Sequence, residues 1–188
     1  MQSPKELWTL YSKSDTVYHI KKLISSDNKY ILLTYVVNTS HPEAAKQDFI
    51  KQETISKTDL FKIKSEYSSY NWTPLKNTPT LFVQINGSAF TYDLEPWDKR
   101  EAILDQIEKS LQKSGNAEWI GCDVGPGGLN LIFELENISG AIPKILDILS
   151  KYGYDKKTII GRRINTTEDD WFYEVIYPLD YNGVFLTM

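Results

Sequence analysis

The fold is decided by residues 116–164, which read NAEWIGCDVGPGGLNLIFELENISGAIPKILDILSKYGYDKKTIIGRRI. This stretch predicts a strand, a glycine turn, a second strand, a helix and a third strand. The run Gly125-Pro126-Gly127-Gly128 favours a tight reversal between the first two strands. Over residues 129–136 apolar and polar side chains alternate, so we predict that one strand face is buried and the other is polar.

Two helices and further strands surround this hairpin. Asn137 or Ser139 is predicted to cap the helix that ends at Gly153, and Pro96 to open an earlier helix that runs to Lys113. Strands at 81–85 and 89–93 flank Asn86-Gly87, a hairpin signal. From residue 89 onward, the order strand, helix, strand, strand, helix, strand is the split β-α-β pattern of ferredoxin-like folds. We therefore predict an α+β fold with two helices on one face of an antiparallel sheet.

The first 78 residues are predicted to form a β-meander, with strands at 7–12, 16–24 and 29–37. Ser40-x-x-Glu43 resembles a capping box and predicts a short helix from Pro42 to about Gln52. Residues 54–78 give no clear pattern. We divide the chain into 1–78, a meander packed on or paired with the main sheet, and 79–188, the α+β ferredoxin-like domain.

Composition indicates a soluble cytoplasmic protein. Hydrophobic residues make up 41% of the chain, yet no apolar run is long enough to span a membrane. No signal peptide is visible at the start of the sequence, and the single cysteine, Cys122, cannot form an internal disulfide.

Charge is distributed unevenly along the chain. Residues 1–94 carry 11 basic and 9 acidic side chains, whereas residues 95–188 carry 10 basic and 16 acidic ones. An acidic half repels nucleic-acid backbones and favours a basic protein partner through long-range steering. We expect a protein partner, and neither nucleic acid nor a membrane.

Catalytic and metal-binding patterns are missing from the sequence. The two histidines, His19 and His41, and Cys122 have neither zinc-ligand spacing nor a nucleophile motif around them. The glycine-rich segment 123–128 joins two strands, so we interpret it as a turn and not as a phosphate loop. We expect no enzyme activity, no cofactor and no metal.

An acidic, aromatic surface is the predicted binding site. An acidic turn at 168–170 runs directly into the aromatic residues 171–173, which resembles an interface anchor with a charged rim. Glu134 and Glu136 share the polar face of the strand at 129–136. The predicted partner-binding residues are Glu134, Glu136, Glu168, Asp169, Asp170, Trp171 and Tyr173.

Two alternatives stay open. A small ligand or metal could bind carboxylates on the open sheet face, with Asp123, Arg162 and Arg163 as ligand-binding residues and a possible enzyme as the result. Arg162 and Arg163 are predicted to point to opposite strand faces and to form a salt bridge with Glu134 or Glu136. The chain could also be a structural subunit that forms a homodimer by pairing strand edges.

The segment Trp119–Leu135, within residues 117–152, resembles the glycine-turn hairpin followed by a helix in immunity proteins of bacterial polymorphic-toxin and contact-dependent inhibition systems. The resemblance implies a small, acidic, cytosolic, non-enzymatic protein that neutralises a basic toxin domain by covering its active site. It carries no binding residue over to this chain.

Overall fold

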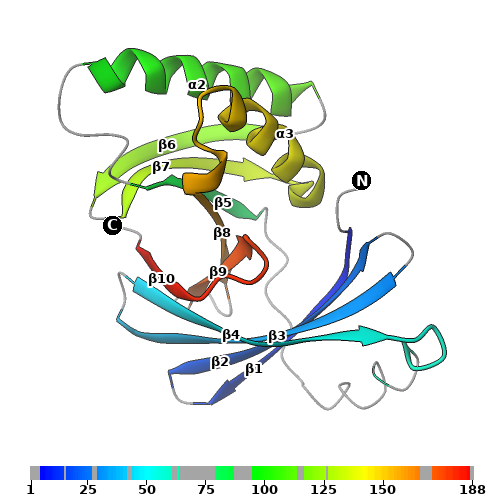
Figure 1. The fold of residues 1–188 in the computed structure, drawn as a ribbon. Helices are drawn as coiled ribbons and strands as arrows, with labels where there is room; N and C mark the ends of the chain where they lie inside the picture. The colour runs from blue at the N-terminus through cyan, green and yellow to red at the C-terminus, as the bar shows by residue number, and fades with distance from the viewer. Residues whose placement is uncertain are drawn as a thin grey trace.

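The computed structural model describes residues 5–14, 16–26, 29–41, 44–60, 63, 79–86, 95–113, 117–125, 127–165 and 171–186. These residues form an α+β fold of two five-stranded sheets, in which all neighbouring strands are antiparallel, together with helices α2 and α3 (Figure 1). The α+β class predicted from the sequence is confirmed.

The first sheet contains the N-terminal meander and ends in the strand β10. Its strand order is β1-β2-β3-β4-β10. The strands are β1 (Lys5–Ser14), β2 (Val17–Ser26), β3 (Lys29–His41), β4 (Ala44–Ile55) and β10 (Gly183–Leu186). The three predicted meander strands are present, and a strand from the far end of the sequence completes their sheet.

The short helix predicted from Pro42 to Gln52 is wrong, because Ala44–Ile55 forms the strand β4. β4 pairs along its length with β3, where Phe49 lies opposite Tyr35, and its other edge pairs with β10. A helix cap contributes only about 1 kcal/mol to the stability of a helix. Pairing on both edges, burial of Gln47 and partial burial of Phe49 therefore override the local capping signal.

The second sheet has the order β6-β7-β5-β8-β9. Its strands are β5 (Thr80–Ile85), β6 (Ala117–Gly125), β7 (Gly128–Leu135), β8 (Thr158–Asn165) and β9 (Trp171–Tyr177). β5 is central and is hydrogen bonded to β7 on one edge and to β8 on the other. Both edges of β5 are thus occupied, and the strand predicted at 89–93 as its hairpin partner lies outside the described residues.

Both helices cover one face of the second sheet, as predicted. α2 (Glu95–Gln112) and α3 (Ile138–Lys151) pack over the apolar face of that sheet (Figure 1). The side chain of Asn137 caps α3 by accepting a hydrogen bond from the backbone N–H of Gly140 at 2.9 Å. Gly153 follows the helix with a φ of 74°, a conformation that favours glycine at this position. The shared core includes Leu81, Val83, Ile85, Ile103, Ile107, Leu111, Leu129, Leu131, Phe133, Leu135, Ile145 and Leu149.

The other face of the second sheet is not open, contrary to our prediction, because the first sheet packs against it. Phe185 of β10 lies on Phe82 and Val175 on this face. Phe172 of β9 points to the opposite face, where it stacks on Tyr18 with ring centroids 4.0 Å apart, so the first sheet contacts both faces of the second sheet at the β9 edge. In Figure 1 the helices lie above the second sheet and the first sheet lies below it. Polar strand residues beneath β10 are buried as a result, and Asn130 is only 1% exposed.

Candidate functional site

The strand register brings several of the predicted binding residues into one row across the second sheet. Glu118, Glu134, Thr80, Arg163 and Tyr173 lie directly opposite one another on consecutive strands. Directly paired residues of an antiparallel sheet point to the same face. This row lies on the face away from the helices, at the sheet end where Tyr173 begins to be covered by the aromatic side chains of Phe82 and Phe185.

Two carboxylates in this row oppose each other. Glu118 of the edge strand β6 is the direct cross-strand partner of Glu134 on β7. Glu118 is exposed and Glu134 is half-buried, and within the described part of the chain neither forms an ion pair. Like charges directly opposite each other on a sheet are destabilising. The two carboxylates therefore carry negative charge that no ion pair among the described residues balances.

An exposed aromatic residue lies on the same face at the opposite edge. Trp171 begins β9, is 40% exposed, and lies under the guanidinium group of Arg163 at 4.4 Å from the ring centroid. Arg163 Nε also donates a hydrogen bond to Asn165 Oδ1 at 2.9 Å. Tyr173 is half-buried and packs edge-on against Phe82. We name Glu118, Glu134, Arg163 and Trp171 the acidic-aromatic face.

The remaining predicted partner residues have different placements. Glu136 is exposed one position beyond the end of β7. The acidic turn Glu168, Asp169 and Asp170 lies outside the described residues.

The alternative ligand-binding set is not brought together. Asp123 Oδ1 accepts a hydrogen bond from Asn130 Nδ2 at 2.6 Å, at the turn end of the β6–β7 hairpin. Arg163 contacts Trp171 on the acidic-aromatic face, whereas Arg162 points elsewhere and binds Glu174 and Glu6. The prediction that the two arginines point to opposite faces agrees with this separation. The predicted salt bridge to Glu134 or Glu136 is wrong for Arg162, because buried Glu174 is its direct cross-strand partner.

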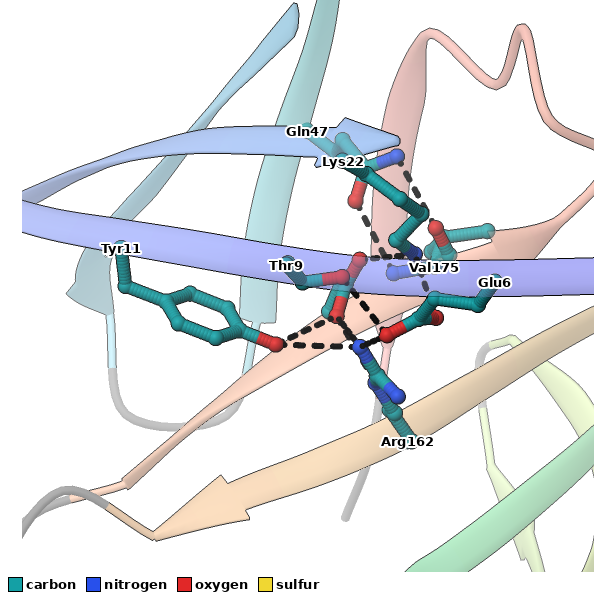
Figure 2. A network of polar contacts seen from close by, with 8 residues as sticks. Glu6, Thr9, Tyr11, Lys22, Gln47, Arg162 and Val175 are labelled. Atoms are coloured by element: carbon teal, nitrogen blue, oxygen red, sulfur yellow. Dashed lines mark hydrogen bonds and ion pairs between the residues drawn. The ribbon is translucent and has the colours of Figure 1, made fainter. Parts of the chain in front are cut away.

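A buried network of charged side chains joins the two sheets (Figure 2). Arg162 Nε donates to Glu174 Oε2 at 2.8 Å, and its Nη2 lies 3.3 Å from Glu6 Oε1 and 3.0 Å from the Tyr11 hydroxyl. Lys22 forms an ion pair with Glu174 and lies 3.8 Å from Glu6. Glu174 is fully buried and Lys22 is 2% exposed. Two cations thus balance the fully buried carboxylate of Glu174 and the partly exposed carboxylate of Glu6, the arrangement that a buried charge requires.

The network keeps its members in defined ionisation states. Burial alone would raise the pKa of Glu6, but the positive charges of Lys22 and Arg162 outweigh it and hold that pKa below its usual range. Burial likewise opposes the charge on Arg162, yet Glu174, Tyr11 and Glu6 keep its pKa well above the usual value. Burial raises the pKa of Tyr11, so its hydroxyl stays protonated and donates to Glu174 at 3.2 Å.

A cavity of about 390 Å³ opens beside this network. Helix α3 forms one wall, the end of β9 and the following residues form a second, and β1 and β2 supply Glu6, Lys22 and Ile24. The apolar lining comes from Ile24, Ile138, Ile142, Leu146, Ile176 and Leu179.

Sequence reasoning missed Glu6, Lys22 and Glu174, although a signal for two of them was present. Lys22 shares a strand face with the buried residues Ile20 and Ile24, and Glu174 lies between Phe172 and Ile176 on a buried face. A charged side chain in an apolar period-two position indicates a buried ion pair. No comparable signal marks Glu6.

Comparison with protein-family models, with curated proteins and with solved structures gave no match. Neither α2 nor α3 has the length and apolar character that a membrane span requires. Within the described ranges, no three His, Cys, Asp or Glu side chains are grouped as metal ligands would be.

Proposed function

We propose that this chain is a non-catalytic binding protein that engages a basic protein domain through the acidic-aromatic face. The observation that carries this proposal is the direct opposition of Glu118 and Glu134 without an ion pair among the described residues. A lysine or arginine from a partner, placed between these carboxylates, replaces a repulsion with two attractions.

Trp171 provides an apolar anchor for the same contact. Its ring is 40% exposed, and the stacked guanidinium group of Arg163 restrains it from one side. Tryptophan and arginine are the side chains most often found at energetically dominant interface positions. The acidic half of the chain, with 10 basic and 16 acidic residues over 95–188, would attract a basic partner over a longer range.

An immunity protein of a bacterial toxin system fits this chemistry, and we propose that class for the chain. Its function would be to neutralise a basic toxin domain in the cytoplasm by covering the active site of the toxin. The support is the surface described above and the resemblance of residues 117–152.

We also infer that the second sheet with α2 and α3 is a ferredoxin-like split β-α-β unit. The support is the chain order β5-α2-β6-β7-α3-β8 together with the strand order β6-β7-β5-β8. In this arrangement β5 takes the place of the strand that the sequence pattern assigned to 89–93, and β9 extends the sheet at one edge.

The test is capture of a partner by immobilised wild-type chain and by the variant Glu118→Gln/Glu134→Gln. The control Glu101→Gln/Asp147→Asn removes the same net charge from exposed positions on α2 and α3. We expect a basic protein to be retained by the wild type and the control, and to bind the test variant more slowly and with a weaker dependence on salt.

Titration of the purified partner then decides the proposal. Equal affinity and equal salt dependence for the wild type and Glu118→Gln/Glu134→Gln would exclude the acidic-aromatic face as the binding site of the partner. Protection of cells that express the partner would assign the immunity function, and a partner that is harmless to cells would exclude it.

A further inference from the structure

The cavity beside α3 is separate from the acidic-aromatic face and has the features of a small-molecule site. Its volume of about 390 Å³ is more than twice that of a cavity of about 150 Å³ that accommodates benzene. It also falls within the range of about 300–1,000 Å³ that is typical of ligand pockets. Its walls are mostly apolar, so a bound molecule needs an apolar body.

One end of the cavity is polar. Lys22 and Glu6 line it, and Lys22 is 2% exposed. The Lys22 ammonium carries three hydrogen-bond donors. It forms an ion pair with Glu174, while Glu6 at 3.8 Å is beyond the length of a normal hydrogen bond. The ammonium therefore retains capacity to donate a hydrogen bond to a molecule in the cavity.

The charge of the network limits what this molecule can be. Glu6 and Glu174 balance Lys22 and Arg162, so the polar end of the cavity has no net charge to offer a ligand. A carboxylate or ammonium head group would add an uncompensated charge beside the 2% exposed Lys22 and the fully buried Glu174, which is costly. A neutral head group with an acceptor oxygen can bond to Lys22 without disturbing the balance.

We propose that this cavity binds an uncharged amphiphile, with an aliphatic or aromatic body against α3 and a neutral acceptor oxygen, such as that of an amide or alcohol, at Lys22. The body contacts Ile142 and Leu146 of α3 on one side and Ile24 of β2 on the other. The head group does not react, and the ion pairs of the network stay intact.

Calorimetric titration of the full chain with a matched series tests the choice of head group. Octanamide, 1-octanol, octanoate and octylammonium share one tail and differ only in polar end. We expect octanamide and 1-octanol to bind, and both charged members to bind about tenfold or more weakly. The proposal is overturned if octanamide gives no binding at millimolar concentration, or if octanoate or octylammonium binds as tightly as octanamide.

Two tryptophan variants on one helix test the location. Leu146→Trp fills the cavity, whereas Ser150→Trp adds the same side chain at an exposed position of α3 that does not line it. Octanamide binding is expected to be lost in Leu146→Trp and kept in Ser150→Trp, with the fold of each variant checked by circular dichroism. If Leu146→Trp unfolds, the location is tested in the wild type instead. We then expect the NMR chemical shifts of the backbone amides in residues 138–146 to change when octanamide is added. Unchanged binding by folded Leu146→Trp, or unchanged amide shifts, overturns the location.

Discussion

Gln47 forms two hydrogen bonds to the backbone of Val175 through a single side-chain amide. Gln47 Nε2 donates to the Val175 carbonyl at 3.2 Å, and the Val175 N–H donates to Gln47 Oε1 at 2.9 Å. Val175 belongs to β9, an edge strand whose outer backbone groups have no neighbouring strand in its own sheet. The amide of Gln47 thus satisfies the strand edge where the two sheets meet.

We expect Gln47→Ala to lower the free energy of unfolding by about 2–4 kcal/mol, because two buried backbone groups lose their partners. Gln52→Ala is the matched control on the same strand, where the side chain is exposed, and should change stability by at most about 0.5 kcal/mol. Urea unfolding curves measure both values. Equal midpoints for the two variants would contradict a role for Gln47 at the junction.

Lys22→Met should destabilise the protein by about 3–5 kcal/mol, because Glu174 remains buried without its cation. Lys46→Met removes a surface partner of Asp48, with side chains 59% and 40% exposed, and should cost less than about 1 kcal/mol. Chemical denaturation of both variants at neutral pH gives the comparison. A Lys22→Met loss as small as that of Lys46→Met would show that the buried pair is dispensable.

Glu6 makes stability depend on pH in the acid range. Its pKa is lowered in the folded state, so the unfolded chain binds the proton more readily. Its contribution is complete above the unfolded value of about 4.3 and is lost as pH falls through the lowered folded value. Glu6→Gln should therefore flatten the fall in stability between about pH 5 and pH 2.

Thermal unfolding across this range measures that slope. Glu53→Gln, which breaks an exposed ion pair with Lys51, serves as the control and should keep the wild-type slope. A wild-type slope in Glu6→Gln would mean that another group carries the pH dependence.

Gly161 provides the space for the ring of Phe185. A methyl group at Gly161 would lie 2.8 Å from Cζ of Phe185, which is fully buried. Gly161→Ala should cost about 1–3 kcal/mol through overpacking, and Phe185→Leu should recover part of that loss in the double variant. Gly121→Ala is the control, because its methyl group meets no atom within 4 Å, and should be close to neutral. Denaturation midpoints of the wild type, Gly161→Ala, Phe185→Leu and the double variant form a double-mutant cycle. If the losses of the two single variants add up in the double variant, the contact between Gly161 and Phe185 is contradicted.

The opposed carboxylates give a prediction that needs no partner. Glu118→Lys places a cation opposite Glu134 and should raise the free energy of unfolding by about 0.2–1 kcal/mol at low salt, with a smaller gain at high salt. Thermal unfolding at two salt concentrations measures the gain. A loss of stability in Glu118→Lys would show that the two carboxylates do not repel each other, and would remove the main support for the acidic-aromatic face.

Sequence patterns predicted what depends on local periodicity. The strand at 129–136, the third strand of the stretch 116–164, both helices and the Asn137 cap follow from apolar spacing and terminal residues, and the structure contains them. The β4 strand could not be predicted, because residues 44–55 become a strand only through pairing with β3 and with β10, more than a hundred residues away. The predicted helix there reflected a cap signal that long-range pairing overrides.

The positions of the candidate binding residues were predictable to a similar extent. Alternation placed Glu134 on the face away from the helices, where the structure has it, and Trp171 is 40% exposed. The covering of that face by Phe185 and the burial of Glu174 beside Lys22 depend on how two sheets meet, which no local pattern contains. Pairing between distant segments therefore decides which polar side chains stay accessible.

The position of β10 constrains how the protein is made. β4 leaves the ribosome more than a hundred residues before β10, the strand that pairs with its edge. Val175, the hydrogen-bond partner of Gln47, is likewise synthesised more than a hundred residues after Gln47. During synthesis the nascent N-terminal sheet therefore exposes an unpaired edge and the surface that later receives Phe172. The interval before residues 171–186 emerge is when this chain is most exposed to aggregation and most dependent on chaperones.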